Sequence, residues 1–538
     1  YAENDIFNYY GRNQNGYYRF TSLANFISGN PSEYDYRAPL PGGSYADIPA
    51  EFTIKNTGFF AQDTWAVNYN LSLLFGVRGD KPSFGSEPIY NECISSAPNP
   101  AGTGPVGCNF GGFGYNNRQL IDGILWQPRF GFNYTFDSDR PTQLRGGVGL
   151  FMGAAPNVWL SGAYQNTGRQ YVEYSIRNST GIGPIFSPDP DNQPTNFATG
   201  TPRQNVDIIH PDLDQPSVWK ANLAFDHELP WYGLVASAEL LLTKVKDAIY
   251  LERLDLGAPN STVGPDGRVM YWNNNGLDAA RWLTSLSSAT GGTQRFNRRS
   301  YVGDVMLLRY TDKGHSQQFT VSLEKPMAEN WSWMVGYTYT AAKEVSPLTS
   351  SQNTSNWNNN PMFNANEDAL VNSRYAIKDR ISGALTFKKA FFGDDATTAS
   401  VFYEGRSGRP FSYVFWNDAN GDSRTFNDLF YVPKGPGDVV FTNLTQNGVT
   451  TTGAQQEAAF FEWLAKHPEL QRYAGSYAPA NEFRAGWTNS FDLRVSQELP
   501  GFWKGHKSSL TLDVMNVGNL LNKKWGLIED AGFNSNLG

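Results

Sequence analysis

Residues 485–517 read AGWTNSFDLRVSQELPGFWKGHKSSLTLDVMNV and contain two alternating segments separated by a turn. Apolar side chains occupy every second position in each segment: Phe491, Leu493 and Val495 before the turn, and Leu510, Leu512 and Val514 after it. A period of two is typical of a β-strand, because successive side chains of a strand point to opposite faces. The stretch therefore predicts a β-hairpin with one apolar and one polar face.

The same alternation recurs along the chain in pairs of segments. Counting the opening hairpin, we predict twelve strands in six hairpins; the other five pair residues 59–65 with 71–78, 129–136 with 144–151, 220–226 with 235–243, 318–324 with 331–340, and 380–387 with 398–404. A short turn joins the two strands of each hairpin, whereas long polar segments join successive hairpins. Residues 1–57 show only short alternations, and we predict that they form mostly surface loop.

This order of short and long connections decides the fold class. A propeller or a sandwich has no reason to place every short connection at one end, whereas an outer-membrane barrel has short periplasmic turns and long extracellular loops. No apolar run approaches the roughly 20 residues of a membrane-spanning helix. We therefore predict an all-β chain, a transmembrane antiparallel up-and-down β-barrel. Aromatic residues that suit a membrane interface mark its short-turn end: Trp231, Tyr232, Trp331, Phe391, Phe392, Phe502 and Trp503.

Composition agrees with this fold class and argues against two classes of function. Only 17% of the 538 residues are charged and 40% are hydrophobic, which suits strands with one apolar face joined by polar loops. The net charge of −8, without a basic run, argues against nucleic-acid binding. The 5 His residues are scattered, and neither a catalytic triad nor a phosphate-binding loop is recognisable, so we expect neither an enzyme nor a cofactor.

Five segments carry a resemblance to a known family. They read NTGFFAQDTWAVNYNLSLLFGVRGD, WKANLAFDHELPWYGLVASAELLLTK, GHSQQFTVSLEKPMAENWSWMVGYTYT, EGRSGRPFSYVFWNDANGDSRTFNDLFYVP and WTNSFDLRVSQELP. In this order they resemble barrel strands of TonB-dependent outer-membrane transporters, most closely the Oar-like branch. The resemblance covers the chain from about Phe52. It implies that residues 1–538 are the barrel portion of a barrel of about 22 strands, without the N-terminal plug and the closing C-terminal strand.

The resemblance also implies a function and a location. It implies TonB-dependent active transport of an unidentified substrate across the bacterial outer membrane, with extracellular loops capturing the ligand and the barrel housing a plug. The expected partners are outer-membrane lipid and lipopolysaccharide, TonB through the missing N-terminal part, and an extracellular small molecule, peptide or glycan. The alternative is a surface adhesin or structural barrel whose loops bind a partner protein.

Charged residues at the polar positions of the predicted strands are candidates for the barrel lumen. There they would contact the plug, one another or the substrate, and the first two roles are the more common ones. The lumenal candidates are Arg78, Arg129, Arg145, Lys220, Asp226, Glu239, Glu324, Arg380, Asp492, Arg494 and Asp513.

The longest predicted loop, residues 405–489, is expected to form the largest part of the ligand- or partner-binding surface. Residues 455–472 within it have helical spacing interrupted at Pro468, which predicts a short amphipathic helix. The candidate contact residues of the loop are aromatic: Phe411, Tyr413, Trp416, Phe430, Tyr431 and Trp463.

Two smaller features suggest a metal site and a disulfide. Side-chain oxygens surround a Gly in the manner of a Ca²⁺ loop at Asp418, Asn420, Asp422 and Asp428, although the usual bidentate Glu is absent and an Asx-rich turn without metal is the alternative. Cys93 and Cys108 enclose a loop rich in Gly and Pro, which predicts a disulfide in an oxidising compartment, with two free thiols as the alternative.

Overall fold

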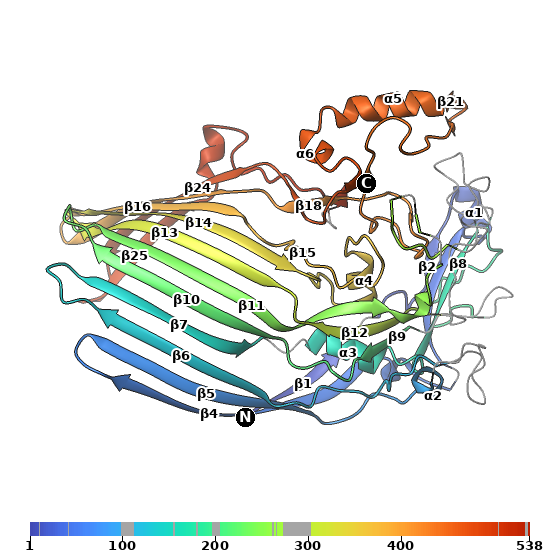
Figure 1. Ribbon diagram of the computed structural model, residues 1–538, viewed down its shortest axis with the longest axis horizontal. Helices are drawn as coiled ribbons and strands as arrows, with labels where there is room; N and C mark the ends of the chain where they lie inside the picture. Colours follow the sequence, from blue (N-terminus) through green and yellow to red (C-terminus); the bar gives the residue numbers. More distant parts are fainter. Residues whose placement is uncertain are drawn as a thin grey trace.

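The computed structural model describes residues 1–9, 11–40, 42–97, 112–153, 157–178, 181–195, 205–260, 263–264, 266–272, 303–503, 505–532 and 536–537. One large antiparallel sheet dominates this part of the chain (Figure 1). Its neighbouring strands follow the order β1 (Ala2–Asn8), β4 (Ala50–Ala66), β5 (Leu71–Phe84), β6 (Leu125–Thr135), β7 (Thr142–Met152), β10 (Ser217–Glu228), β11 (Val235–Arg253), β13 (His315–Ala328), β14 (Trp331–Glu344), β16 (Asp379–Phe392), β17 (Asp395–Arg406), β24 (Thr488–Pro500) and β25 (Lys507–Val514).

All six predicted hairpins are confirmed. They are β4–β5, β6–β7, β10–β11, β13–β14, β16–β17 and β24–β25. Figure 1 shows their turns at one end of the sheet and the helices and long connections at the other, as the order of connections predicts. In the β13–β14 turn, Glu329 and Asn330 have φ angles of 55° and 74°. Two successive left-handed residues are typical of the type I′ turn, whose twist matches that of the flanking strands.

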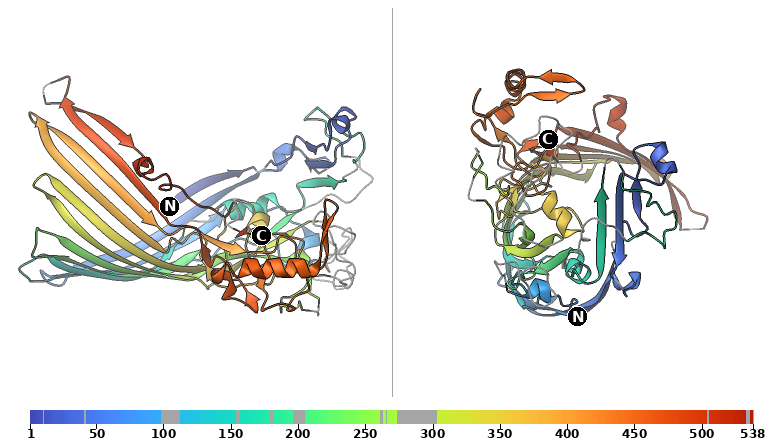
Figure 2. Two further views of the ribbon diagram at one scale, coloured as in Figure 1. Left: turned by 90° about the horizontal axis from the view of Figure 1, so that it is seen from above. Right: turned by 90° about the vertical axis from the view of Figure 1, so that its right-hand side faces the viewer.

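The sheet is strongly curved, and its polar face is the concave one. Figure 2 shows helices α3 (Asn157–Gln165) and α4 (Asn353–Asn358) inside the curve. The ring of Phe52 stacks on Tyr164 of α3 with centroids 3.9 Å apart. Phe52 and Phe60 point to the same face because they are an even number of residues apart in β4, and Phe60 lies opposite Arg78. The face that carries Arg78 therefore faces the inside of the curve.

The best-packed core lies beyond the barrel strands, at the long-loop end. There β11 continues past its pairing with β10 and pairs with β12 (Val305–Thr311), which pairs in parallel with β9 (Val206–Ile209). Strand β12 is buried on both faces, because Val305 and Leu307 pack in one apolar cluster and Met306 and Leu308 in another. We call β9, β12, the end of β11, α3, α4 and residues 405–489 the outer-loop assembly.

The remaining elements are short and belong mainly to the long-loop end. The strands are β2 (Tyr17–Arg19), β3 (Glu33–Pro39), β8 (Tyr171–Arg177), β15 (Val371–Asn372), β18 (Pro410–Tyr413), β19 (Tyr431–Val432), β20 (Leu444–Gln446), β21 (Val449–Thr451), β22 (Ser476–Tyr477), β23 (Phe483–Arg484) and β26 (Asn536–Leu537). The helices are α1 (Leu23–Ile27), α2 (Glu92–Ser95), α5 (Gly453–Leu464) and α6 (Pro468–Gln471), with short 3-10 turns at Tyr45–Asp47, Leu254–Leu256 and Val517–Leu520. Among the described residues, no helix is long and apolar enough to span a membrane.

The expectation of mostly loop in residues 1–57 is wrong. This segment contains β1, β2, β3 and the start of β4. Strand β1 pairs with the outer part of β4, and β3 pairs with β8, more than a hundred residues away. Pairing between distant segments leaves no mark on local periodicity. The sequence of β3, EYDYRAP, consists mainly of polar and aromatic residues, and its Tyr34 and Tyr36 are buried in a separate cluster. The predicted helix at 455–472 is confirmed as α5 and α6, with Pro468 starting the second helix.

Candidate functional site

The strand register places all eleven lumenal candidates on one face of the sheet. For example, Arg129 lies opposite Gly149, which lies opposite Lys220, and residues opposite one another point to the same side. The register of the other strand pairs places the whole set on this same face: Arg78, Arg129, Arg145, Lys220, Asp226, Glu239, Glu324, Arg380, Asp492, Arg494 and Asp513. The opposite face carries apolar residues of the same strands: Phe130, Phe132, Leu493, Val495, Leu510 and Leu512.

Most of these charges are paired within the wall of the sheet. Arg494 Nε lies 2.6 Å from Asp513 Oδ1 on the neighbouring strand, and both side chains are well exposed. Arg380 likewise pairs with Glu404 at 2.7 Å across β16 and β17. Further wall contacts join Arg145 to Asp226 and Arg78 to Asp80. Three of these pairs, Arg494–Asp513, Arg380–Glu404 and Arg145–Asp226, join neighbouring strands, whereas Arg78 and Asp80 lie two residues apart on β5.

Five candidates form no ion pair with a described residue, and one of them, Asp492, accepts the backbone N–H of Asn516 at 2.7 Å. Among the described residues, no ion pair involves Arg129, Lys220, Glu239 or Glu324, and Glu239 accepts only a long hydrogen bond of 3.5 Å from Asn222. Arg129 and Lys220 occupy one row with Gly149 between them, so their backbones lie roughly 10 Å apart. The concave face thus has a basic spot without a carboxylate opposite it.

Residues 405–489 form an ordered unit with a small core of their own. Val432, Leu464, Leu470, Ala478 and Phe483 are buried together. Three of the six candidate contact residues, Phe411, Tyr413 and Phe430, pack against this core and stabilise the loop itself. The exposed candidates are Trp416, at 64% exposure with its ring tilted against Phe426, and Trp463, at 38% exposure. Tyr431 donates its hydroxyl hydrogen to Asp438 at 2.8 Å.

In the acidic turn at residues 418–428, side-chain oxygens accept hydrogen bonds from backbone N–H groups. Asp418 Oδ1 accepts the N–H of Gly421 at 2.6 Å and Oδ2 accepts the N–H of Ser423 at 2.8 Å. Asp428 Oδ2 accepts the N–H of Ala419 at 2.8 Å, and Asn420 Oδ1 accepts the N–H of Asp422. This is the hydrogen bonding of an Asx-rich turn. Among the described residues, no three His, Cys, Asp or Glu side chains are arranged to hold a metal ion. The Ca²⁺ site at Asp418, Asn420, Asp422 and Asp428 stays a prediction.

A buried arginine fixes this turn to another segment. Arg268, at 1% exposure, lies between the rings of Phe363 and Phe415, each 5.1 Å from its guanidinium. Its Nε lies 2.7 Å from Asp266, and its Nη1 lies 3.4 Å from Asp428. Burial raises the pKa of the Asp428 carboxyl well above its ordinary value, the nearby Asp422 raises it further, and the Arg268 charge opposes that shift.

A second buried arginine joins the same turn to β11 and β12. Arg253 lies at the end of β11, is 1% exposed, and donates Nη1–H to the backbone oxygen of Asp422 at 3.1 Å. Its other nitrogens bind Asp255 at 3.0 Å and Asp304 at 2.8 Å, and its guanidinium lies over Trp357 of α4. Sequence reasoning missed both arginines, because nothing in the local pattern distinguishes them from a lumenal or surface arginine.

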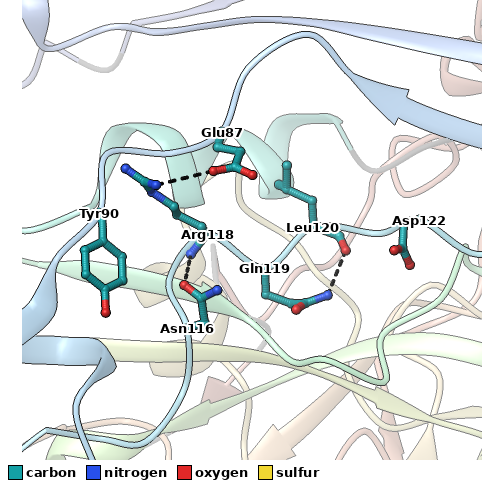
Figure 3. A pocket seen from close by; sticks show the side chains of 7 residues that line it. All are labelled: Glu87, Tyr90, Asn116, Arg118, Gln119, Leu120 and Asp122. Atoms are coloured by element: carbon teal, nitrogen blue, oxygen red, sulfur yellow. Dashed lines mark hydrogen bonds and ion pairs between the residues drawn. The ribbon is translucent and has the colours of Figure 1, made fainter.

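The connection between β5 and β6 contributes a polar pocket of about 490 Å³ (Figure 3). It is lined by Glu87, Tyr90, Asn116, Arg118, Gln119, Leu120 and Asp122. None of these residues belongs to a motif, and the sequence analysis did not select them. The same connection contains Cys93, in α2, which is disulfide-bonded. Its predicted partner Cys108 lies outside the described residues, so the pairing itself stays a prediction.

A family model and several solved structures of outer-membrane proteins match this chain. The family model "Outer membrane beta barrel domain" matches residues 1–524. The chain belongs to this family. Membership of the outer membrane β-barrel family places the sheet in the bacterial outer membrane, with the apolar convex face toward lipid, short turns in the periplasm and long loops outside the cell.

Solved structures of outer-membrane proteins are similar to this barrel at low sequence identity. The outer membrane transporter YddB from Escherichia coli is 11% identical with a TM-score of 0.38, over 87% of this chain and 51% of that one. The siderophore receptor PirA from Acinetobacter baumannii is 11% identical with a TM-score of 0.40, over 90% of this chain and 47% of that one. The chain thus spans about half the length of these structures. No curated protein sequence matches it.

Proposed function

We propose that this chain is the barrel portion of a TonB-dependent transporter of the Oar-like branch, which moves an unidentified substrate across the outer membrane. The observation that carries this proposal is the concave polar face with four charges, Arg129, Lys220, Glu239 and Glu324, that form no ion pair with a described residue. A structural barrel gains nothing from unpaired charges in its lumen. A transporter uses them to hold a movable plug or to contact passing substrate.

In this proposal the barrel is a passive wall. The outer-loop assembly captures substrate, and exposed Trp416 and Trp463 contribute to that surface. A plug encoded before this chain would receive force from TonB, and its polar groups would exchange contacts with Arg129 and Lys220. Lipid and lipopolysaccharide cover the convex face, whose exposed apolar side chains include Leu240 and Phe319. The proposal assigns no catalytic role to any residue.

A second candidate function is adhesion to a partner protein. The observation that favours it is the outer-loop assembly, in which Arg253 and Arg268 fasten residues 405–489 to other segments. A capture loop for a small substrate commonly moves, whereas a fixed surface with exposed tryptophans suits a protein partner. The two functions differ in whether they need TonB.

The test uses the complete gene in its own outer membrane. A deletion strain is grown in competition with its parent on a panel of carbon and metal sources, and any defect is complemented with the wild-type gene or with Arg129→Gln/Lys220→Gln. We expect the double variant to reach the surface at normal levels and to fail to complement. The control is Arg380→Gln, whose partner Glu404 lies in the wall. Full complementation by the double variant would contradict the transport proposal. So would a competitive defect of the deletion strain against its parent that stays the same when TonB is depleted in both strains.

A further inference from the structure

Two buried asparagines stabilise the pocket in the connection between β5 and β6. Asn91 and Asn117 are 4% and 1% exposed and are adjacent in sequence to the lining residues Tyr90, Asn116 and Arg118. Asn117 accepts the N–H of Asn91 at 2.9 Å and donates Nδ2–H to the backbone oxygen of Ile89 at 2.8 Å. Asn91 in turn donates to the backbone oxygen of Thr167 at 2.8 Å. These bonds fix the segment that carries Tyr90 against the segment that carries Arg118.

The guanidinium of Arg118 is held in place across the pocket (Figure 3). It lies 5.2 Å from the centre of the Tyr90 ring, 3.5 Å from Glu87 Oε2 and within hydrogen-bond distance of the backbone oxygen of Pro88, at 3.2 Å. The backbone N–H of the same residue donates to Asn116 Oδ1 at 3.0 Å. A side chain fixed by three contacts loses little conformational entropy when a ligand binds.

Much of the hydrogen-bonding capacity of the pocket is unused. Among the described residues, no side chain or backbone group pairs with the hydroxyl of Tyr90 or the carboxylate of Asp122, and Figure 3 shows Asp122 apart from the bonded groups. Asn116 keeps its amide donors, and Gln119 uses only its Nε2, toward Leu120 at 3.0 Å. The free groups include both donors and acceptors.

We propose that this pocket binds a neutral saccharide unit. Sugar hydroxyls act as donors and acceptors at once, so they match a wall of carboxylate, amide and phenol groups, and the apolar face of a sugar ring can pack on Tyr90. The volume of about 490 Å³ lies in the range of small-molecule sites. Other ligand classes fit worse. The lining has no His, Met or Cys for a soft metal, two carboxylates against one guanidinium disfavour an anion, and Leu120 alone cannot hold a lipid chain.

This site extends the proposed function by naming a ligand class at the cell surface, but its binding does not depend on transport. Purified full-length protein in detergent is titrated by calorimetry with maltose, cellobiose and N,N′-diacetylchitobiose, and with trialanine as a peptide probe. We expect at least one disaccharide to bind. Tyr90→Ala and Asp122→Asn should each weaken that binding at least tenfold, because the first removes the ring on which the sugar packs and the second replaces a carboxylate that no described residue binds.

The matched control is Tyr375→Ala, which removes another exposed tyrosine at the long-loop end of the sheet and should leave affinity unchanged. Heat-modified migration on a gel shows that each variant still folds. Failure of every disaccharide to bind, binding of trialanine instead, or unchanged affinity in both pocket variants overturns the proposal. A saccharide that binds but is not taken up would leave the pocket assignment standing and count against transport.

Discussion

The wall of the barrel and the outer-loop assembly use the same kind of ion pair in opposite surroundings. Arg494 lies 2.6 Å from Asp513 on the concave face, and 63% of its side chain is exposed. Arg253 lies 2.8 Å from Asp304 in the outer-loop assembly, and 1% of its side chain is exposed. A charge in water loses little when its partner is removed, whereas a buried charge has no solvent to replace the partner. Equal geometry therefore predicts unequal consequences.

This difference also separates two functions of charge in the molecule. Wall pairs can be exchanged for contacts to a plug or a substrate, because water and neighbouring side chains compensate for the loss. The buried arginines connect segments far apart in sequence, Arg253 to residue Asp422 across 169 positions, and have no such freedom. We expect the outer-loop assembly to unfold as one unit and the barrel to remain folded when it does.

The largest effect is expected from Arg253→Met. The substitution keeps apolar volume near Trp357 but leaves Asp255 and Asp304 buried with one cation fewer, and breaking a buried pair costs about 3 to 5 kcal/mol. Hydrogen exchange should accelerate in residues 305–311 and 405–489, while heat-modified gel migration reports an intact barrel. The control Arg409→Met removes an exposed partner of Asp530 and should change neither. Equal protection in both variants would remove the contrast between the two regions.

The next effect concerns the convex face. Leu240 lies between Leu223 and Phe319 on the lipid side of central strands. Leu240→Arg should destabilise the barrel in lipid vesicles by about 2 to 4 kcal/mol, because lipid does not solvate the charge. Its neighbour Leu241 points to the concave face, so Leu241→Arg is the matched control with a much smaller loss. Urea titration of both variants measures the difference, and equal losses would contradict the assignment of the faces.

A smaller, pH-dependent effect is expected at Asp207 of β9, which lies in the outer-loop assembly. Burial raises the pKa of Asp207 to about 6, from 3.8, against hydrogen bonds from Asn166 and Asn353. Because the folded state then holds a proton that the unfolded state has released, this group makes the assembly less stable as pH rises from about 4 to about 6. Asp207→Asn should flatten that part of the profile. Urea midpoints of the assembly at several pH values measure it, and an unchanged slope in the variant would refute the assignment.

The smallest effect is expected at the wall. Arg494→Ala leaves Asp513 in an aqueous lumen, so the urea midpoint of the barrel should not change measurably. The double variant Arg494→Ala/Asp513→Ala should behave like either single variant. A clear loss in Arg494→Ala that the double variant reverses would show that water does not reach this pair, and the comparison with Arg253 would lose its basis.

The sequence indicated the barrel through properties that are local. Alternation at Phe491, Leu493 and Val495 assigns each residue to a face, and the lengths of the connections assign each hairpin to an end of the sheet. Both signals can be read from residues close together in the sequence. The alternation extends along the whole strand because one face contacts lipid and the other contacts water. The twelve strands and the common face of the lumenal candidates could therefore be predicted without tertiary contacts.

Periodicity failed where a strand is buried on both sides or pairs at long range. Strand β12 contains the run VMLL, which has no alternation because both faces are covered, and β3 depends on β8 for its pairing. The pocket residues Tyr90 and Asp122 carried no motif, because they meet only after the connection between β5 and β6 folds on its buried asparagines.

By itself, then, the sequence determined which side of each strand faces lipid, because that choice depends on one residue and its immediate neighbours. Only the tertiary structure decided which charges stay unpaired in the lumen, which arginines are buried in the outer-loop assembly and where a polar pocket forms. Arg129 and Arg253 have the same side chain and both belong to strands, yet one lies on an open concave face and the other is buried against the ring of Trp357. The free energy of a charge depends on its exposure to water and on its charged partners, and distant parts of the chain determine both.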